Sequence, residues 1–162
     1  MRIFAALLLL ISFAVHSETT SGIYYGFFTD HVLDDDVYNE ENHVILLQHN
    51  DWYLGTFSNS FAKRSYVVAW SFWDYRKDFG HNSRYNFDSG WHTTTWFVEF
   101  NAAVGAATGY QDTPNRTVLG LSPALIGAFD VGRSHEQFEY GVRTMYIPKN
   151  VLNAGLFFNF KY

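Results

Sequence analysis

Three polar residues that fall where predicted strands end have the side chains that acyl transfer requires. His31 ends a predicted strand at 23–31, and Asn59 and Ser60 follow a predicted strand at 52–58. Because these two strands would run in the same direction, we expect all three residues on one rim of a sheet. An imidazole acts as a general base toward a hydroxyl, and a carbonyl or carboxylate holds its tautomer. The alternative interpretation is that all three are ordinary polar loop residues.

The strand that separates its two faces most clearly is the last one, at 154–162. Side chains alternate between the faces of a strand, and here one row is entirely apolar. That row consists of Ala154, Leu156, Phe158, Phe160 and Tyr162. A terminal strand with exposed aromatics invites aggregation in water, whereas lipid covers it when the strand closes an outer-membrane barrel. The alternative is a last strand packed into a sandwich core.

Seven further segments have strand character, most of them with an apolar and a polar row. They are 23–31, 42–49, 52–58, 65–74, 91–110, 118–131 and 136–147. Asn50-Asp51 is a tight-turn pair of the kind that joins antiparallel strands, and the polar segment 75–90 is predicted to be a loop. The sequence therefore predicts eight strands.

Ionisable residues in the middle of strands indicate which row faces inward. Burial of Glu99, Glu139 and Arg143 is costly unless they pair, and a barrel lumen would let them pair with one another. Eight strands leave an interior just wide enough for side chains or one small ligand. We therefore predict an all-β, eight-stranded antiparallel transmembrane β-barrel. A soluble lipocalin-type barrel, with its apolar row inward and its charged row outward, is the rival architecture.

The first 17 residues have the features of a secretory signal peptide. Arg2 supplies a positive charge, 3–15 is an apolar run too short to span a bilayer, and cleavage is expected before Glu18. Removal leaves 18–162 as a single domain. Phe, Tyr and Trp form 20% of the chain, more than a core of this size holds easily, and membrane barrels place such residues in girdles at the lipid interfaces. We expect a monomer in the bacterial outer membrane.

Composition and motifs argue against several other classes of function. The chain has no cysteine, so thiolate chemistry and disulfides are excluded. Its net charge of −5 argues against a nucleic-acid partner. His43 and His49 are too far apart on one strand to share a metal, and the glycines show no phosphate-binding pattern. We expect neither a metal nor a cofactor.

Three short motifs follow one another along the chain. His31 precedes Tyr38-Asn39-Glu40, the stretch 53–72 contains Tyr53, Phe57, Ser60 and Lys63, and Met145-Tyr146-Ile147-Pro148 precedes the last predicted turn. In their order and spacing these motifs resemble the outer-membrane lipid A palmitoyltransferases of the PagP type, and related small phage and bacterial barrels. The resemblance covers most of the mature chain, in patches.

The resemblance implies transfer of a palmitoyl-type chain from a phospholipid to lipid A in the outer leaflet. It makes His31 the general base and Ser60 a catalytic hydroxyl. The family's third residue, an aspartate, is Asn59 here, and an amide orients the imidazole without stabilising its charged form. Lys63 and Arg64 would contact lipid phosphates or only snorkel to the interface. The alternative is a non-catalytic barrel, structural or surface-modifying, on the same scaffold.

Overall fold

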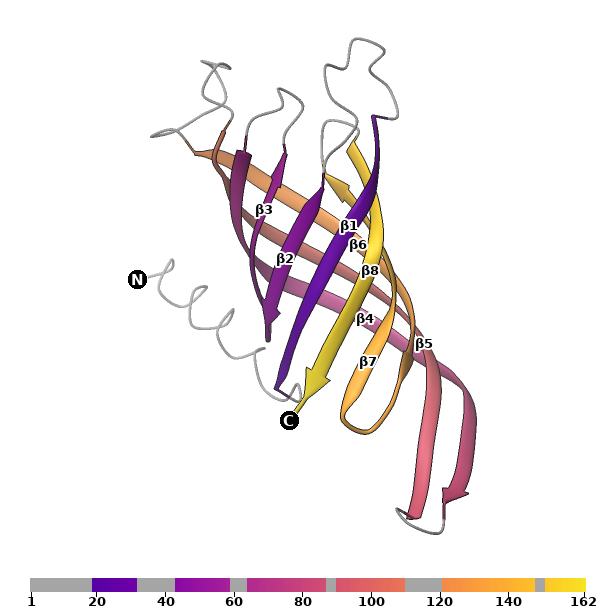
Figure 1. The fold of residues 1–162 in the computed structure, drawn as a ribbon. Coiled ribbons are helices and arrows are strands. Elements are labelled where there is room, and N and C mark those ends of the chain that lie inside the picture. Colours follow the sequence, from indigo (N-terminus) through magenta and orange to yellow (C-terminus); the bar gives the residue numbers. More distant parts are fainter. Residues whose placement is uncertain (1–18, 32–42, 59–63, 87–89, 110–120, 148–150) are drawn as a thin grey trace, which may run out of the picture.

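The computed structural model describes residues 19–31, 43–58, 64–86, 90–109, 121–147 and 151–162. These residues form eight strands that close into an antiparallel barrel in the order β1 to β8 (Figure 1). The strands are β1 (Thr20–His31), β2 (Val44–His49), β3 (Trp52–Ser58), β4 (Arg64–Asn86), β5 (Gly90–Ala107), β6 (Ser122–Ser134), β7 (Phe138–Ile147) and β8 (Val151–Lys161). The predicted all-β, eight-stranded antiparallel barrel is confirmed. None of the described residues belongs to a helix long and apolar enough to span a membrane.

Pairing of the first and last strands closes the barrel. Thr20 lies opposite Lys161, and His31 lies opposite Val151 at the other end of the same ladder. The end that holds Thr20 and Lys161 is hereafter the terminal end, and the end that holds His31 is the distal end. β2 and β3 meet at the terminal end in a two-residue turn, in which Asn50 has a φ of 51°. Asparagine tolerates this left-handed conformation better than most residues, so the predicted Asn50-Asp51 turn is confirmed.

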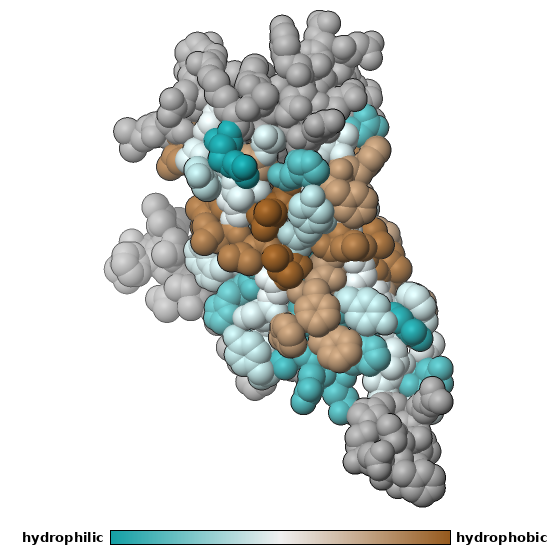
Figure 2. Space-filling model, in the orientation of Figure 1, coloured by the Kyte–Doolittle hydropathy of each residue, from teal (hydrophilic) through white to brown (hydrophobic). Residues whose placement is uncertain are grey.

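Apolar side chains are exposed on the outer face of every strand, while the inner face carries both polar and apolar side chains. On β8, Leu156 and Phe160 are exposed, whereas Phe157 and Asn159 are buried. Figure 2 shows the resulting apolar band across the middle of the wall, with hydrophilic residues below it toward the terminal end. Exposed outward residues from the eight strands include Ile23, Ile45, Leu54, Val68, Val104, Leu125, Val142 and Leu156. The predicted alternation of the last strand is therefore confirmed.

Register shifts reset this alternation at three places in the described strands, the third of them between Phe79 and Asn82 on β4. The register between β1 and β8 shifts between Gly26 and Phe28, and Phe27 and Phe28 are both exposed. The register between β4 and β5 shifts between Ser71 and Trp73, so that Phe72 and Trp73 both point outward. A bulge inserts one extra residue into one strand of a pair. Beyond each bulge, the odd- and even-numbered residues of that strand therefore exchange the faces on which they lie.

The long β4–β5 hairpin corrects the prediction of a loop at 75–90. β4 continues past Trp70, its last partner on β3, and pairs with β5 as far as Asn86. A closed barrel requires its strand register to advance around the circumference, which leaves the lower part of β4 beyond the short strand β3. Figure 1 shows the end of this hairpin projecting beyond the barrel at the terminal end. The polar composition of 75–86 therefore belongs to a strand rather than to a loop.

The barrel interior has two halves of different chemistry. Toward the distal end it holds the apolar residues Val44, Leu46, Val67, Ile126 and Met145, each at most 9% exposed, together with the buried polar residues Thr29, Ser65, Ser122 and Asn153. Toward the terminal end it holds charged and amide side chains. Small residues also lie on the inner surface, and they are Ala69, Ala103, Gly105, Ala124 and Gly141.

Candidate functional site

The predicted catalytic rim is only partly covered by the structure. β1 and β3 run in the same direction, so His31 and Ser58, their last residues, lie at the distal end (Figure 1). Asn59, Ser60 and Lys63 lie outside the described residues, as does the side chain of His31. Arg64 is the first residue of β4, lies opposite Ser58 and is exposed. The geometry of the predicted catalytic group therefore remains a prediction.

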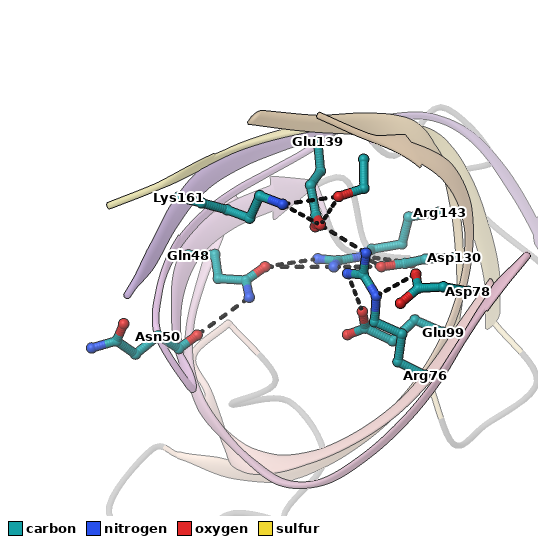
Figure 3. A network of polar contacts seen from close by, with 10 residues as sticks. Gln48, Asn50, Arg76, Asp78, Glu99, Asp130, Glu139, Arg143 and Lys161 are labelled. Carbon is teal, nitrogen blue, oxygen red and sulfur yellow. Dashed lines mark hydrogen bonds and ion pairs between the residues drawn. The ribbon is translucent and has the colours of Figure 1, made fainter. Parts of the chain in front are cut away.

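A different group of polar residues is described in full, and it fills the lumen toward the terminal end (Figure 3). At its centre Arg143 of β7 donates from Nη2 to Asp130 Oδ2 at 2.7 Å and from Nε to Asp130 Oδ1 at 2.8 Å. Both side chains are almost fully buried. Gln48, from β2 across the barrel, accepts longer hydrogen bonds of 3.4 and 3.5 Å from the same guanidinium. Charge-assisted, two-point pairing of this kind compensates much of the desolvation of the two ions.

Arg76 connects three strands in the same lumen. Its Nε lies 3.0 Å from Asp78 Oδ1, its Nη1 lies 3.6 Å from Glu99 Oε2, and its Nη2 lies 2.9 Å from Glu139 Oε1. Asp78 shares β4 with Arg76, while Glu99 and Glu139 come from β5 and β7. Arg76 is therefore the cation that compensates two of the predicted lumen acids.

A third cation completes the network at the terminal rim. Lys161 donates from Nζ to Ser134 Oγ at 2.9 Å and lies 3.4 Å from Glu139 Oε1. Ser134 in turn donates to Glu139 Oε1 at 2.9 Å. Glu139 is thus paired with residues from β4, β6 and β8. The prediction that Glu99, Glu139 and Arg143 pair with one another was wrong in its partners, because Asp130, Arg76 and Lys161 supply the opposite charges.

Two phenylalanine rings support the guanidinium groups. The Arg76 guanidinium carbon lies 3.9 Å from the centre of the Phe97 ring, and that of Arg143 lies 5.4 Å from the centre of the Phe157 ring. The two rings lie 6.1 Å apart. A side chain at Gly132 would meet both rings, so this glycine leaves them the space they occupy. The stacking restricts where each cation can point.

A cavity of about 610 Å³ occupies this polar half of the lumen. The terminal rim contributes Thr20, Asn50, Asp51, Asp74 and Lys161 to its lining, so the cavity lies toward the terminal end. Partial burial raises the pKa of the Asp51 carboxyl, and the charge of Asp74 raises it further. Acidic groups outnumber cations along the lining, yet no group of three or more potential metal ligands forms within the described ranges. The cavity suits water or a polar solute rather than an acyl chain.

A hydroxyl–imidazole contact lies on the outer wall, away from the predicted catalytic rim. Ser21 Oγ is 2.8 Å from His49 Nδ1 and 2.9 Å from the Tyr162 hydroxyl, at the terminal end. Ser21 and His49 are direct partners across β1 and β2. His49 is exposed and points outward. The contact between Ser21 and His49 therefore lies at the terminal edge of the apolar band on the outer wall.

Sequence reasoning missed Arg76 and undervalued Asp130. Arg76 fell in the predicted loop, because the bulge at Phe72 and Trp73 breaks the alternation just before it. Asp130 is buried on β6 and lies directly opposite Glu99 and Arg143 in the observed register. An inward aspartate beside an inward arginine on consecutive strands was the signal that could have identified the pair.

No family model matches the chain, and no curated protein matches it either.

Proposed function

We propose that this chain is an outer-membrane β-barrel whose outer wall contacts lipid directly. The observation that carries the proposal is the distribution of polarity: apolar side chains from all eight strands are exposed, while Arg143, Asp130 and Glu139 are buried. In a lipocalin-type soluble barrel the apolar row would face inward. Lipid is the solvent in which an exposed apolar wall and a charged, self-paired interior are both favourable.

On this scaffold the proposed activity is transfer of a palmitoyl-type chain from a phospholipid to lipid A. His31 acts as general base, Ser60 as a catalytic hydroxyl, and Asn59 orients the His31 ring. A lipid A hydroxyl forms an ester with the acyl carbonyl carbon, the bond to the phospholipid oxygen breaks, and the proton passes through His31 to that oxygen. Lys63 and Arg64 hold lipid phosphates at the same rim. Support comes from the order of the sequence motifs and from the shared distal position of His31 and Ser58.

The apolar side chains in the distal half of the lumen have the chemistry to contact an acyl chain, although the buried polar residues Thr29 and Asn153 lie nearer that rim. Val44, Leu46 and Met145 already fill this half of the lumen and are each at most 5% exposed. This packing favours the second candidate function, a non-catalytic barrel that keeps the scaffold without the chemistry. The replacement of the family's aspartate by Asn59 points the same way.

Mass spectrometry of lipid A separates the two candidates. Cells expressing the wild-type chain should contain lipid A heavier by one acyl chain, and His31→Ala and Ser60→Ala should abolish that species while the barrel still reaches the membrane. Asn59→Asp should increase the modified fraction, since a carboxylate stabilises the imidazolium better than an amide does. Absence of the added chain in the wild type and in Asn59→Asp would leave only the non-catalytic barrel.

A further inference from the structure

The outer wall carries a positive charge near the terminal end, within a group of aromatic side chains. Arg133 is the next-to-last residue of β6, and its direct partners are Trp96 on β5 and Tyr140 on β7. The guanidinium carbon of Arg133 lies 4.8 Å from the centre of the Trp96 ring. This contact keeps the cation against the wall of the barrel instead of extended into solvent.

The guanidinium of Arg133 has an unused hydrogen-bond donor. Its Nε atom is buried and makes no hydrogen bond, although arginine donors in proteins are normally satisfied. No described acidic residue forms an ion pair with Arg133. Three cations of the lower barrel, Arg76, Arg143 and Lys161, point into the lumen and are paired there. Among the described residues, Arg133 therefore has no anionic partner on the side of the wall that it faces.

A second cation flanks the same tryptophan. Lys77 of β4 is exposed and lies opposite Val98, the next outward residue after Trp96 on β5. Diagonal neighbours on one face of a sheet are within reach of a long side chain. No ion pair of Lys77 occurs within the part of the chain that the structure describes. Trp96 thus lies between two outward cations on neighbouring strands.

The wall next to these cations, toward the distal end, is apolar. Val98 and Phe100 follow Trp96 on the outer face of β5, and Val131 and Phe129 lie opposite them on β6. The Phe100 and Phe129 rings lie 4.7 Å apart and are both exposed. Positive charge near the rim with hydrocarbon beyond it matches an amphiphile whose anionic head points to the terminal end.

We propose that Arg133 and Lys77, with Trp96 between them, bind the phosphate of a phospholipid in the membrane leaflet nearer the terminal end. The lipid's acyl chains lie along Val98, Phe100, Phe129 and Val131. This proposal rests on the proposed insertion of the barrel in a membrane. Guanidinium and ammonium groups both form charge-assisted hydrogen bonds with phosphate oxygens. A free phosphate ion would use the cations but not the apolar wall, so the lipid is the ligand that fits the whole surface.

The test uses the folded chain in an alkyl maltoside detergent, which contains no phosphate. Phosphatidylglycerol is titrated into it, and native mass spectrometry gives the dissociation constant of the first bound lipid. Arg133→Gln and Lys77→Gln should each weaken binding about tenfold, the loss expected for one charge-assisted hydrogen bond. Arg133→Lys should fall between Arg133→Gln and the wild type. Gln137→Ala, which changes an exposed uncharged residue of the same rim, should bind as the wild type does.

Two further arms identify the ligand and separate this proposal from membrane insertion itself. Diacylglycerol, which lacks the phosphate, should bind equally to the wild type and Arg133→Gln, and millimolar inorganic phosphate should not displace phosphatidylglycerol. Equal phosphatidylglycerol affinity in the wild type, Arg133→Gln and Lys77→Gln would overturn the site, and displacement by inorganic phosphate would reassign it to a free anion. Failure of the wild type to insert into vesicles would instead reject the proposed function.

Discussion

Arg143 and Asp130 form a two-point ion pair between neighbouring strands inside the barrel. The shortest contact, from Arg143 Nη2 to Asp130 Oδ2, is 2.7 Å, and the two side chains are 4% and 3% exposed. Because Asp130 lies directly opposite Arg143 in the β6–β7 register, the pair also fixes which residues of the two strands align. A slip of one of these strands by one residue would turn its charge onto the outer, apolar wall and leave the other charge unpaired in the lumen.

Removal of one charge from this pair should destabilise the barrel strongly. Asp130→Asn keeps the size of the side chain but leaves Arg143 as an uncompensated buried cation, at a cost of about 3 kcal/mol in the free energy of unfolding. Urea unfolding of the chain in lipid vesicles measures the change. Asp78→Asn is the matched control, since the Asp78 side chain is 52% exposed, and it should cost under about 1 kcal/mol. Equal losses in the two variants would contradict the importance of the buried pair.

The Arg76 network should respond to salt in a way that the Arg143 pair does not. The Arg76 side chain is 28% exposed, beside a cavity large enough for water and ions. Arg76→Gln should cost about 1 kcal/mol at low ionic strength, and most of that cost should vanish in 1 M salt, where the screening length is about 3 Å. The cost of Asp130→Asn should stay nearly constant over the same range. Unfolding curves at two salt concentrations test this, and a salt-independent cost for Arg76→Gln would be inconsistent with a hydrated network.

Two glycines should respond in opposite ways to alanine. A side chain at Gly141 would collide with the carbonyl oxygen of Val131 and with the backbone of Gly132. Gly141→Ala should therefore separate β6 from β7 and cost about 2 kcal/mol. A side chain at Gly127 would meet nothing within 4 Å, so Gly127→Ala should be neutral or stabilise by about 0.5 kcal/mol through lower unfolded-state entropy. Thermal unfolding of the two variants measures both effects, and an equal response would contradict the close strand approach at Gly141.

Direct lipid contact predicts that the effect of an outward charge depends on its depth. Leu156 lies mid-strand on β8 and is 56% exposed, whereas Tyr162 follows the end of that strand. Leu156→Arg should cost about 2–4 kcal/mol in a bilayer, and Tyr162→Arg under about 1 kcal/mol. Folding equilibria in vesicles give both values. If Leu156→Arg is as stable as Tyr162→Arg, water rather than lipid surrounds the middle of the wall.

Sequence reasoning recovered the barrel because alternation is a local signal. Each of the eight predicted strands overlaps an observed one. The inward positions of Glu99, Glu139 and Arg143 follow from the alternation of side chains alone. Alternation did not predict how far β4 extends. The bulge at Phe72 and Trp73 exchanges the inward and outward positions along the strand. The charged residues after it therefore resembled a loop, although Arg76 points into the lumen.

The candidate catalytic group was harder to assess for a different physical reason. Asn59, Ser60 and Lys63 fall between β3 and β4, where no repeating pattern determines the backbone. The pairing of strands places His31 and Ser58 at one end of the barrel, but it does not determine which way their side chains point. The ion pairs of the lumen depend on the register between neighbouring strands. Asp130 lies opposite Arg143, and Arg76 opposite Glu99, only in the observed register, which alternation within one strand does not determine.

The most direct test of the central claim is the solvent in which residues 18–162 fold. The urea-unfolded chain is diluted either into detergent-free buffer or into phospholipid vesicles, and the vesicles are then floated on a density gradient. Contact between the apolar wall and lipid predicts that a folded, protease-resistant barrel floats with the vesicles, while the sample in buffer aggregates. A monomeric, folded and soluble chain in buffer, absent from the vesicle fraction, would contradict membrane insertion and every proposal that depends on it.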